Sequence, residues 1–102
     1  MGLPARDAQS QRKRIHVFYS GRVQGVGFRM SAEESAHGLG VVGWVKNLRD
    51  GRVELVGEGE EPRLKQFLDQ IQAGPMKNFI QHVDISWSYA EDTFDDFEIR
   101  YY

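Results

Sequence analysis

The feature that most constrains the fold is a hairpin signal between two helix patterns. Residues 41–48 and 52–57 are rich in β-branched and apolar residues, and only Arg49-Asp50-Gly51 separates them. Asp-Gly between two such runs predicts a β-hairpin, because both turn residues must accept a positive φ. The centre of the chain is therefore predicted to be two antiparallel strands.

A strand and a helix are predicted ahead of this hairpin. Ile15, Val17 and Tyr19 alternate with His16, Phe18 and Ser20, which is the period of a strand with unlike faces, ending near Gly21. From Phe28 to Leu39, apolar or small residues recur at the spacing of one helix face. Gly40 then supplies a C-terminal cap for this helix.

A second helix and two more strands are predicted after the hairpin. Glu60-Glu61-Pro62 favours a helix start, and apolar residues at 64, 67, 68 and 71 follow until Gly74-Pro75 stops the pattern. Residues 79–89 alternate as a strand, and an acidic loop, 91–96, precedes a last short strand with Phe97, Ile99 and Tyr101 on one face. The Trp, Tyr and Phe residues, Trp44 and Trp87 among them, alternate as core residues do.

The element order is β-α-β-β-α-β plus a short terminal strand. This order predicts an α+β fold, the ferredoxin-like split βαβ sandwich, with two helices on one face of an antiparallel sheet. Right-handed crossovers make the first strand parallel to the Trp44 strand, with the Arg52 strand between them. The loop after Gly21 and the residue Asn47 are therefore expected to meet at one edge of the sheet.

Length and composition limit the further possibilities. At 102 residues we expect one domain, at 14–102, preceded by a disordered extension at 1–13 that lacks periodicity. The formal charge of −2 gives no general attraction to nucleic acid or to acidic membranes, and no run approaches the roughly 20 apolar residues of a membrane span. The absence of cysteine excludes thiolate chemistry and fits a reducing compartment. Together with the lack of a membrane span, this predicts a cytoplasmic protein, and we further expect a monomer.

The glycine-rich segment 21–29 predicts an anion site. Its glycines let successive backbone N–H groups turn inward, and its end becomes the first turn of a helix, where unpaired donors and a partial positive charge favour phosphate. Arg29 adds a planar guanidinium that can hold two oxygens at once. The candidate phosphate-binding loop is Gln24, Gly25, Val26, Gly27, Phe28 and Arg29.

Other functions are less well supported by the sequence. Met30 stands where a dinucleotide fingerprint needs a third glycine, and no Gly-Lys-Ser/Thr is present for a P-loop. An RNA-recognition motif would need aromatic residues on a strand, whereas this segment leads into a helix. His16, His37 and His82 lack metal-ligand spacing, so no metal or cofactor is expected. The acidic residues Glu58, Glu60, Glu61, Glu91, Asp92, Asp95 and Asp96 are interpreted as solvated loops.

The motifs resemble the acylphosphatase family. GRVQGVGFR at 21–29, GWVKN at 43–47 and DGRVE at 50–54 occur in matching order, and the similarity extends from about Ile15 to Tyr101. The resemblance implies the ferredoxin-like fold and metal-independent hydrolysis of acyl phosphates to carboxylate and phosphate. It also implies that Arg29 binds phosphate together with loop amides and that Asn47 positions the attacking water. Met30, Gly38 and the N-terminal extension depart from the family pattern.

The chemistry of the reaction agrees with these residue types. An acyl phosphate loses a carboxylate, whose conjugate acid has a pKa near 4, so a general acid is dispensable. Asn47 could hold a water without placing a negative charge beside the phosphate. Taken alone, Asn47 is better explained as a strand-end or turn residue capping Asp50-Gly51, but its expected meeting with Arg29 favours the water. Inorganic phosphate, the product, should inhibit competitively. The alternative function is a non-catalytic anion-binding or regulatory module of the same fold.

Overall fold

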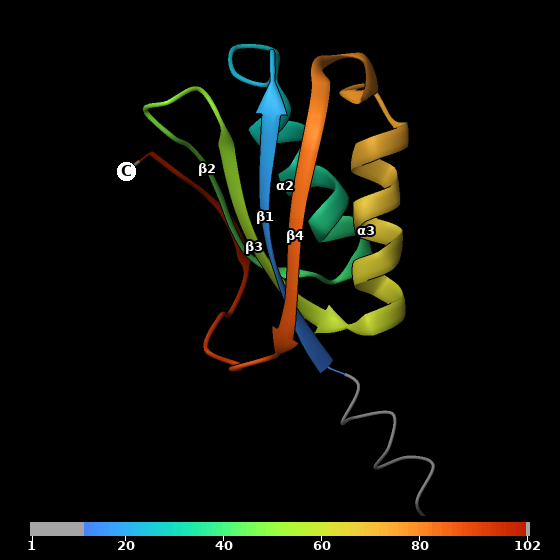
Figure 1. Cartoon of the computed structure of the whole chain (residues 1–102). Helices are drawn as coiled ribbons and strands as arrows, with labels where there is room; N and C mark the ends of the chain where they lie inside the picture. The colour runs from blue at the N-terminus through green and yellow to red at the C-terminus, as the bar shows by residue number, and fades with distance from the viewer. Residues whose placement is uncertain (1–11, 102) are drawn as a thin grey trace, which may run out of the picture.

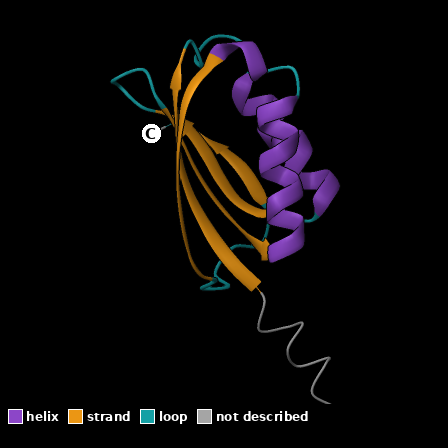
Figure 2. Ribbon diagram, turned by 45° about the vertical axis from the view of Figure 1, so that its right-hand side comes forward, coloured by secondary structure: helices purple, strands orange, loops and turns teal. Residues whose placement is uncertain are grey.

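The computed structural model describes residues 12–101, which form a five-stranded sheet with two helices packed on one face (Figures 1 and 2). The order of elements is the predicted ferredoxin-like one. In sequence they are β1 (Arg12–Gly21), α2 (Phe28–Leu39), β2 (Val42–Asn47), β3 (Val53–Glu60), α3 (Glu61–Ala73), the 3₁₀ turn η1 (Lys77–Phe79), β4 (Ile80–Tyr89) and β5 (Phe97–Arg100).

The strands lie in the order β4-β1-β3-β2-β5. β3 is antiparallel to both β1 and β2, so β1 and β2 run parallel with β3 between them, as predicted. The prediction of an antiparallel sheet is wrong for the last strand, because β5 pairs in parallel with β2. β4 ends at the end of the sheet where β2 begins. The loop after β4 runs across this end of the sheet to the far side of β2, so β5 starts there and runs in the same direction as β2.

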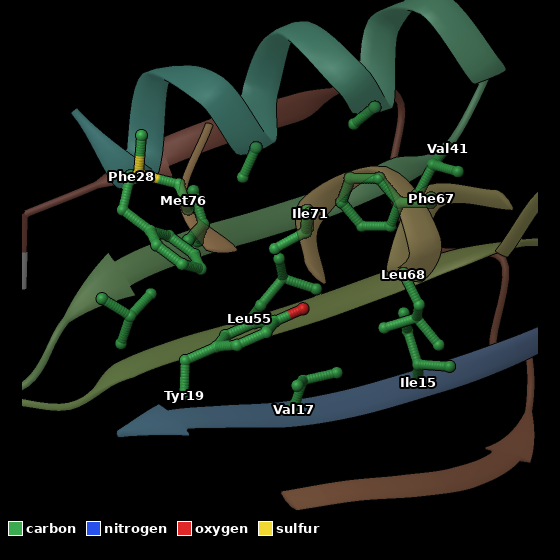
Figure 3. Close-up of a cluster of buried hydrophobic side chains, with 14 of the residues drawn as sticks. Ile15, Val17, Tyr19, Phe28, Val41, Leu55, Phe67, Leu68, Ile71 and Met76 are labelled. Carbon is green, nitrogen blue, oxygen red and sulfur yellow. The ribbon is translucent and has the colours of Figure 1, made fainter. Parts of the chain in front are cut away.

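The core fills the space between the helices and one face of the sheet (Figure 3). Ile15, Val17 and Tyr19 of β1 are fully buried on this face, and they lie against the apolar faces of α2 and α3. The helix residues in the core are Phe28, Ala32 and Ala36 of α2 and Leu64, Phe67, Leu68 and Ile71 of α3. The helical and strand periodicities of the sequence therefore identify these core residues correctly. The same alternation assigned Trp87 and Tyr101 to the core, which is wrong, because they are 43% and 73% exposed.

Two strands extend further than the sequence predicts. β1 begins at Arg12, not Ile15, and β3 continues to Glu60, because residues 12–14 pair with residues 58–60. Residues 1–11 of the predicted extension lie outside the described residues.

Glu58 is fully buried, so its interpretation as a solvated loop residue is wrong. Its carboxylate lies 2.9 Å from the guanidinium of Arg14 and accepts hydrogen bonds from the backbone N–H groups of Glu91 and Asp92.

The hairpin turn differs from the predicted one in its length and in the φ of Asp50. The Leu48 N–H donates to the Arg52 carbonyl oxygen at 2.8 Å and the Gly51 N–H donates to the Leu48 carbonyl oxygen at 3.2 Å, so the loop contains three residues. Only Gly51 takes a positive φ, of +96°, because this longer turn requires the left-handed conformation at one position. The carboxylate of Asp50 accepts a hydrogen bond from the backbone N–H of Arg52.

Candidate active site

The predicted site residues meet at one end of the sheet. The loop after β1 and the β2–β3 hairpin lie at the same end in Figure 1, and β5 ends beside them. A pocket of about 140 Å³ lies between these segments. Its lining residues are Val23, Gly25, Gly27, Phe28, Arg29, Met30, Asn47, Ile99 and Tyr101. Arg29 and Asn47 therefore share one pocket, as their predicted roles require.

The loop presents backbone donors to this pocket. Gly25 and Gly27 have φ values of +77° and +82°, and a Cβ at either position would contact nothing, so the backbone conformation and not space requires glycine. Gly27 is the N-cap of α2 and supplies no side-chain cap. Within residues 12–101, no acceptor is found for the N–H groups of residues 24–30, and the first helical bond is from Ser31 to Gly27. These donors are available to an anion.

Arg29 lies in the first turn of α2 at the rim of the pocket. Its guanidinium carbon is 5.0 Å from the centre of the Tyr101 ring, a cation–π contact that helps to fix the side chain. Among the residues that the structure describes, no carboxylate lies within the 4.0 Å of an ion pair with Arg29. The positive charge of Arg29 is therefore free to bind an anionic group of a ligand.

Asn47 is the last residue of β2 and pairs with Val53 of β3. Its side-chain oxygen, Oδ1, is buried and has no hydrogen-bond donor within the described part of the chain. A buried acceptor without a donor costs roughly 1–3 kcal/mol, so such atoms call for an explanation. The hydrogen bonds of the hairpin turn involve Leu48, Asp50, Gly51 and Arg52, and in the described part of the chain none involves the Asn47 side chain. The alternative role as a turn cap therefore has no structural support.

The other two residues of the predicted loop point elsewhere. Gln24 and Val26 do not line the pocket. The Gln24 Nε2 group donates to the carbonyl oxygens of Leu48 at 2.7 Å and Arg52 at 2.8 Å, which ties the loop to the hairpin. Val26 packs against the hydrophobic core. Their side chains hold the loop in place, and only their backbone belongs to the candidate anion site.

Four lining residues were not found by sequence reasoning. Val23 and Met30 flank the predicted loop, while Ile99 and Tyr101 come from the last strand and the residue after it. The alternation of Phe97, Ile99 and Tyr101 predicted a common face, but not that β5 lies beside β2. Without that pairing, the sequence offers no signal that the C-terminal segment reaches Arg29.

The electrostatics of the site come from Arg29 and the backbone, since no acid or histidine among residues 12–101 lines the pocket. Asp50, in the neighbouring hairpin, has its pKa lowered mainly by the hydrogen bond from the Arg52 backbone N–H, and further by the Arg52 side chain. Within residues 12–101, no three His, Asp or Glu side chains come together as metal ligands. Neither described helix is long and apolar enough to cross a membrane.

Comparisons with known proteins point to one family. The family model described as Acylphosphatase matches residues 15–99. The chain is 45% identical over 89 residues to the acylphosphatase of Trichormus variabilis, covering 87% of this chain and 88% of that protein. Two solved structures are similar to it. The crystal structure of acylphosphatase from Bacillus subtilis has a TM-score of 0.82 and 34% identity, covering 87% of this chain and 99% of that one. The structure of an acylphosphatase from Coxiella burnetii has a TM-score of 0.81 and 38% identity, covering 91% and 97%.

Proposed function

The chain belongs to the acylphosphatase family, enzymes that hydrolyse acyl phosphates, and we propose that Arg29, the backbone of residues 24–29 and Asn47 carry out this hydrolysis. The observation that supports this assignment most strongly is their meeting in one pocket. The residues that carry a permanent cation, a row of N–H donors and an amide oxygen line the same small pocket. This combination suits a phosphate and a nucleophilic water together.

Arg29 and the loop amides would bind the phosphoryl group. The guanidinium can hold two phosphate oxygens in parallel, and the N–H groups at the start of α2 can take the others. In the loose transition state of phosphoryl transfer, charge spreads over the equatorial oxygens, so these contacts strengthen as the reaction proceeds. The ring of Tyr101 supports this role by holding the guanidinium in place.

Asn47 would position the attacking water. A water that donates a hydrogen bond to Oδ1 would supply the donor that this buried oxygen lacks, and its own oxygen could then be directed at phosphorus. The amide is neutral, so it adds no repulsion toward the phosphate as a carboxylate would. The new bond forms between the water oxygen and phosphorus, and the released proton ends on phosphate or solvent.

The leaving group needs little help from the protein. When the bond between phosphorus and the carboxyl oxygen breaks, the electron pair stays on a carboxylate that is stable at neutral pH. A general acid is therefore unnecessary, and none of the described residues that line the pocket is a histidine or an acid. We propose that the reaction requires no metal, because Arg29 supplies positive charge at the phosphate.

We further propose a monomeric, cytoplasmic enzyme that its product inhibits. The groups that we assign to the reaction, Arg29, the loop amides and Asn47, all belong to one chain, so one chain would carry a full set of them. A chain without cysteine suits a reducing compartment. Inorganic phosphate should compete with substrate, because it would occupy the same N–H groups and Arg29.

The test is hydrolysis of benzoyl phosphate by the purified protein, with phosphate binding measured by calorimetry. The proposal predicts turnover that inorganic phosphate inhibits competitively and that Arg29→Ala abolishes. Noncompetitive inhibition would place the anion site elsewhere. Phosphate binding without any release of benzoate would instead indicate a non-catalytic anion-binding module.

A further inference from the structure

A second pocket lies at the opposite end of the sheet from the phosphate loop. It has a volume of about 440 Å³, within the usual range of small-molecule sites, and is lined by Lys13, Glu61, Lys65, Trp87, Ser88 and Tyr89. These residues lie where β1 and α3 begin and β4 ends, at the lower end of Figure 1. None of them lines the pocket of Arg29 and Asn47. The proposed reaction therefore leaves this pocket without a role.

One wall of the second pocket is aromatic and exposed. Trp87 and Tyr89 are two residues apart in β4, so they share the face on which Val83 and Ile85 pack against the core. The sequence pattern placed Trp87 in the core, but 43% of Trp87 and 74% of Tyr89 are exposed, which corrects that interpretation. A flat ring stacked on these side chains would bury apolar surface that water now contacts.

The charged residues of this pocket leave one unbalanced positive charge. Lys65 is paired with Glu61 at 3.0 Å, so these two cancel. The Lys13 Nζ lies 4.3 Å from the centre of the Tyr89 ring, and within residues 12–101 no carboxylate forms an ion pair with it. A singly charged anion would neutralise the pocket. A doubly charged phosphate would leave excess negative charge beside Glu61.

We propose that this pocket binds a planar aromatic monocarboxylate. Its ring lies against Trp87 and Tyr89, and its carboxylate pairs with Lys13. The aromatic wall selects the flat ring, the unbalanced charge selects the anion, and Glu61 disfavours a dianion.

The test is an NMR titration of the full-length protein with 2-naphthoate, in the presence of inorganic phosphate that fills the catalytic pocket. We expect saturable shifts of the Trp87 indole N–H and of the Ser88 and Tyr89 amides. The indole of Trp44, which lies between Lys46 and Arg100 on the other face of the sheet, is an internal control and should not shift. 2-Naphthylmethanol lacks the charge and cyclohexanecarboxylate lacks the flat ring, so each should bind at least about fivefold more weakly.

Matched variants separate the two parts of the site. Trp87→Ala should raise the Kd for 2-naphthoate about tenfold, on the scale of a lost aromatic stack, while Lys13→Gln weakens binding and Lys13→Arg preserves it. Lys77→Gln removes an exposed lysine elsewhere and should change nothing. All four variants should retain benzoyl phosphate hydrolysis, which shows that they are folded. Equal binding of the naphthyl alcohol, unchanged binding to Lys13→Gln, or shifts confined to residues 24–29 would overturn the proposal.

Discussion

The side-chain amide of Gln24 donates a hydrogen bond to the carbonyl oxygen of Leu48 at 2.7 Å, and so joins the phosphate loop to the residue directly after Asn47. A second bond from the same nitrogen reaches the Arg52 carbonyl oxygen at 2.8 Å. Gln24 thereby couples the loop that would bind phosphate to the strand end that would hold the water.

Gln24→Ala should therefore lower catalytic efficiency without removing any group that touches substrate. We expect kcat/KM for benzoyl phosphate to fall about tenfold, because the relative positions of the loop and Asn47 are no longer fixed. Steady-state kinetics measure the effect, and Gln66→Ala, which removes an exposed amide on α3, is the matched control. Unchanged efficiency in Gln24→Ala would show that the loop holds its position without this tether.

Glu58 should be a major determinant of stability. Its carboxylate is fully buried, pairs with Arg14 at 2.9 Å and accepts hydrogen bonds from two backbone N–H groups. Glu58→Gln therefore leaves the half-buried Arg14 with only the exposed carboxylate of Glu91, at 3.4 Å, as an ionic partner. We expect the free energy of unfolding in urea to fall by about 3 kcal/mol. Glu60→Gln, two residues along the same strand and exposed, should change it by less than about 0.5 kcal/mol. Equal effects of the two substitutions would contradict this reading of Glu58.

Tyr19 should make the protein less stable at alkaline pH. Burial raises the pKa of its hydroxyl, which also finds no hydrogen-bond partner among residues 12–101. The folded protein keeps the proton, while the unfolded chain releases it near pH 10. The contribution of Tyr19 to the free energy of unfolding is therefore fully present below pH 10, and it falls by about 1.4 kcal/mol for each pH unit above that.

Tyr19→Phe should remove that contribution to the slope and leave stability at pH 7 unchanged or higher, because an unsatisfied buried hydroxyl is lost. Urea unfolding between pH 7 and 11 measures both effects. The exposed substitution Tyr89→Phe serves as control and should retain the wild-type slope. A marked loss of stability at pH 7 in Tyr19→Phe would indicate that the hydroxyl has a partner after all.

Removal of metal ions should leave the activity intact. Arg29 and the loop amides supply the positive electrostatics at the phosphate, so exhaustive treatment with EDTA should change kcat for benzoyl phosphate by less than twofold. A loss of activity that a divalent cation restores would refute the metal-free mechanism.

Local patterns in the sequence predict the helices and strands and single out the two principal site residues, Arg29 and Asn47. The periodicity of β1, α2 and α3 and the Asp50-Gly51 turn are local signals, and the handedness of the crossovers brings the Arg29 loop and Asn47 to one edge. The parallel pairing of β5, and with it the contact of Tyr101 with Arg29, depends on where a seven-residue loop crosses the sheet. No periodicity encodes that crossing.

Buried polar groups were the hardest features to predict. Glu58 lies among acidic residues that read as solvent-exposed, and only the register of β1 against β3 shows that Arg14 stands opposite it. Gln24 appeared to be one residue of a phosphate loop, whereas its partners are carbonyl groups of a hairpin more than 20 residues away. Such pairings are set by tertiary structure and leave no trace in local composition.

The most direct test of the central claim is a comparison of Asn47→Ala with Arg29→Ala by turnover and by calorimetric phosphate binding. Arg29→Ala should damage both, and Arg29→Lys should rescue poorly, because an ammonium cannot reproduce the two-pronged contact of the guanidinium. Asn47→Ala should lower kcat about 100-fold, which corresponds to about 2.7 kcal/mol, while phosphate still binds nearly as well as to the wild type. If Asn47→Ala turns over normally, or loses phosphate affinity as severely as Arg29→Ala, Asn47 does not position the water and the assignment of the site is wrong.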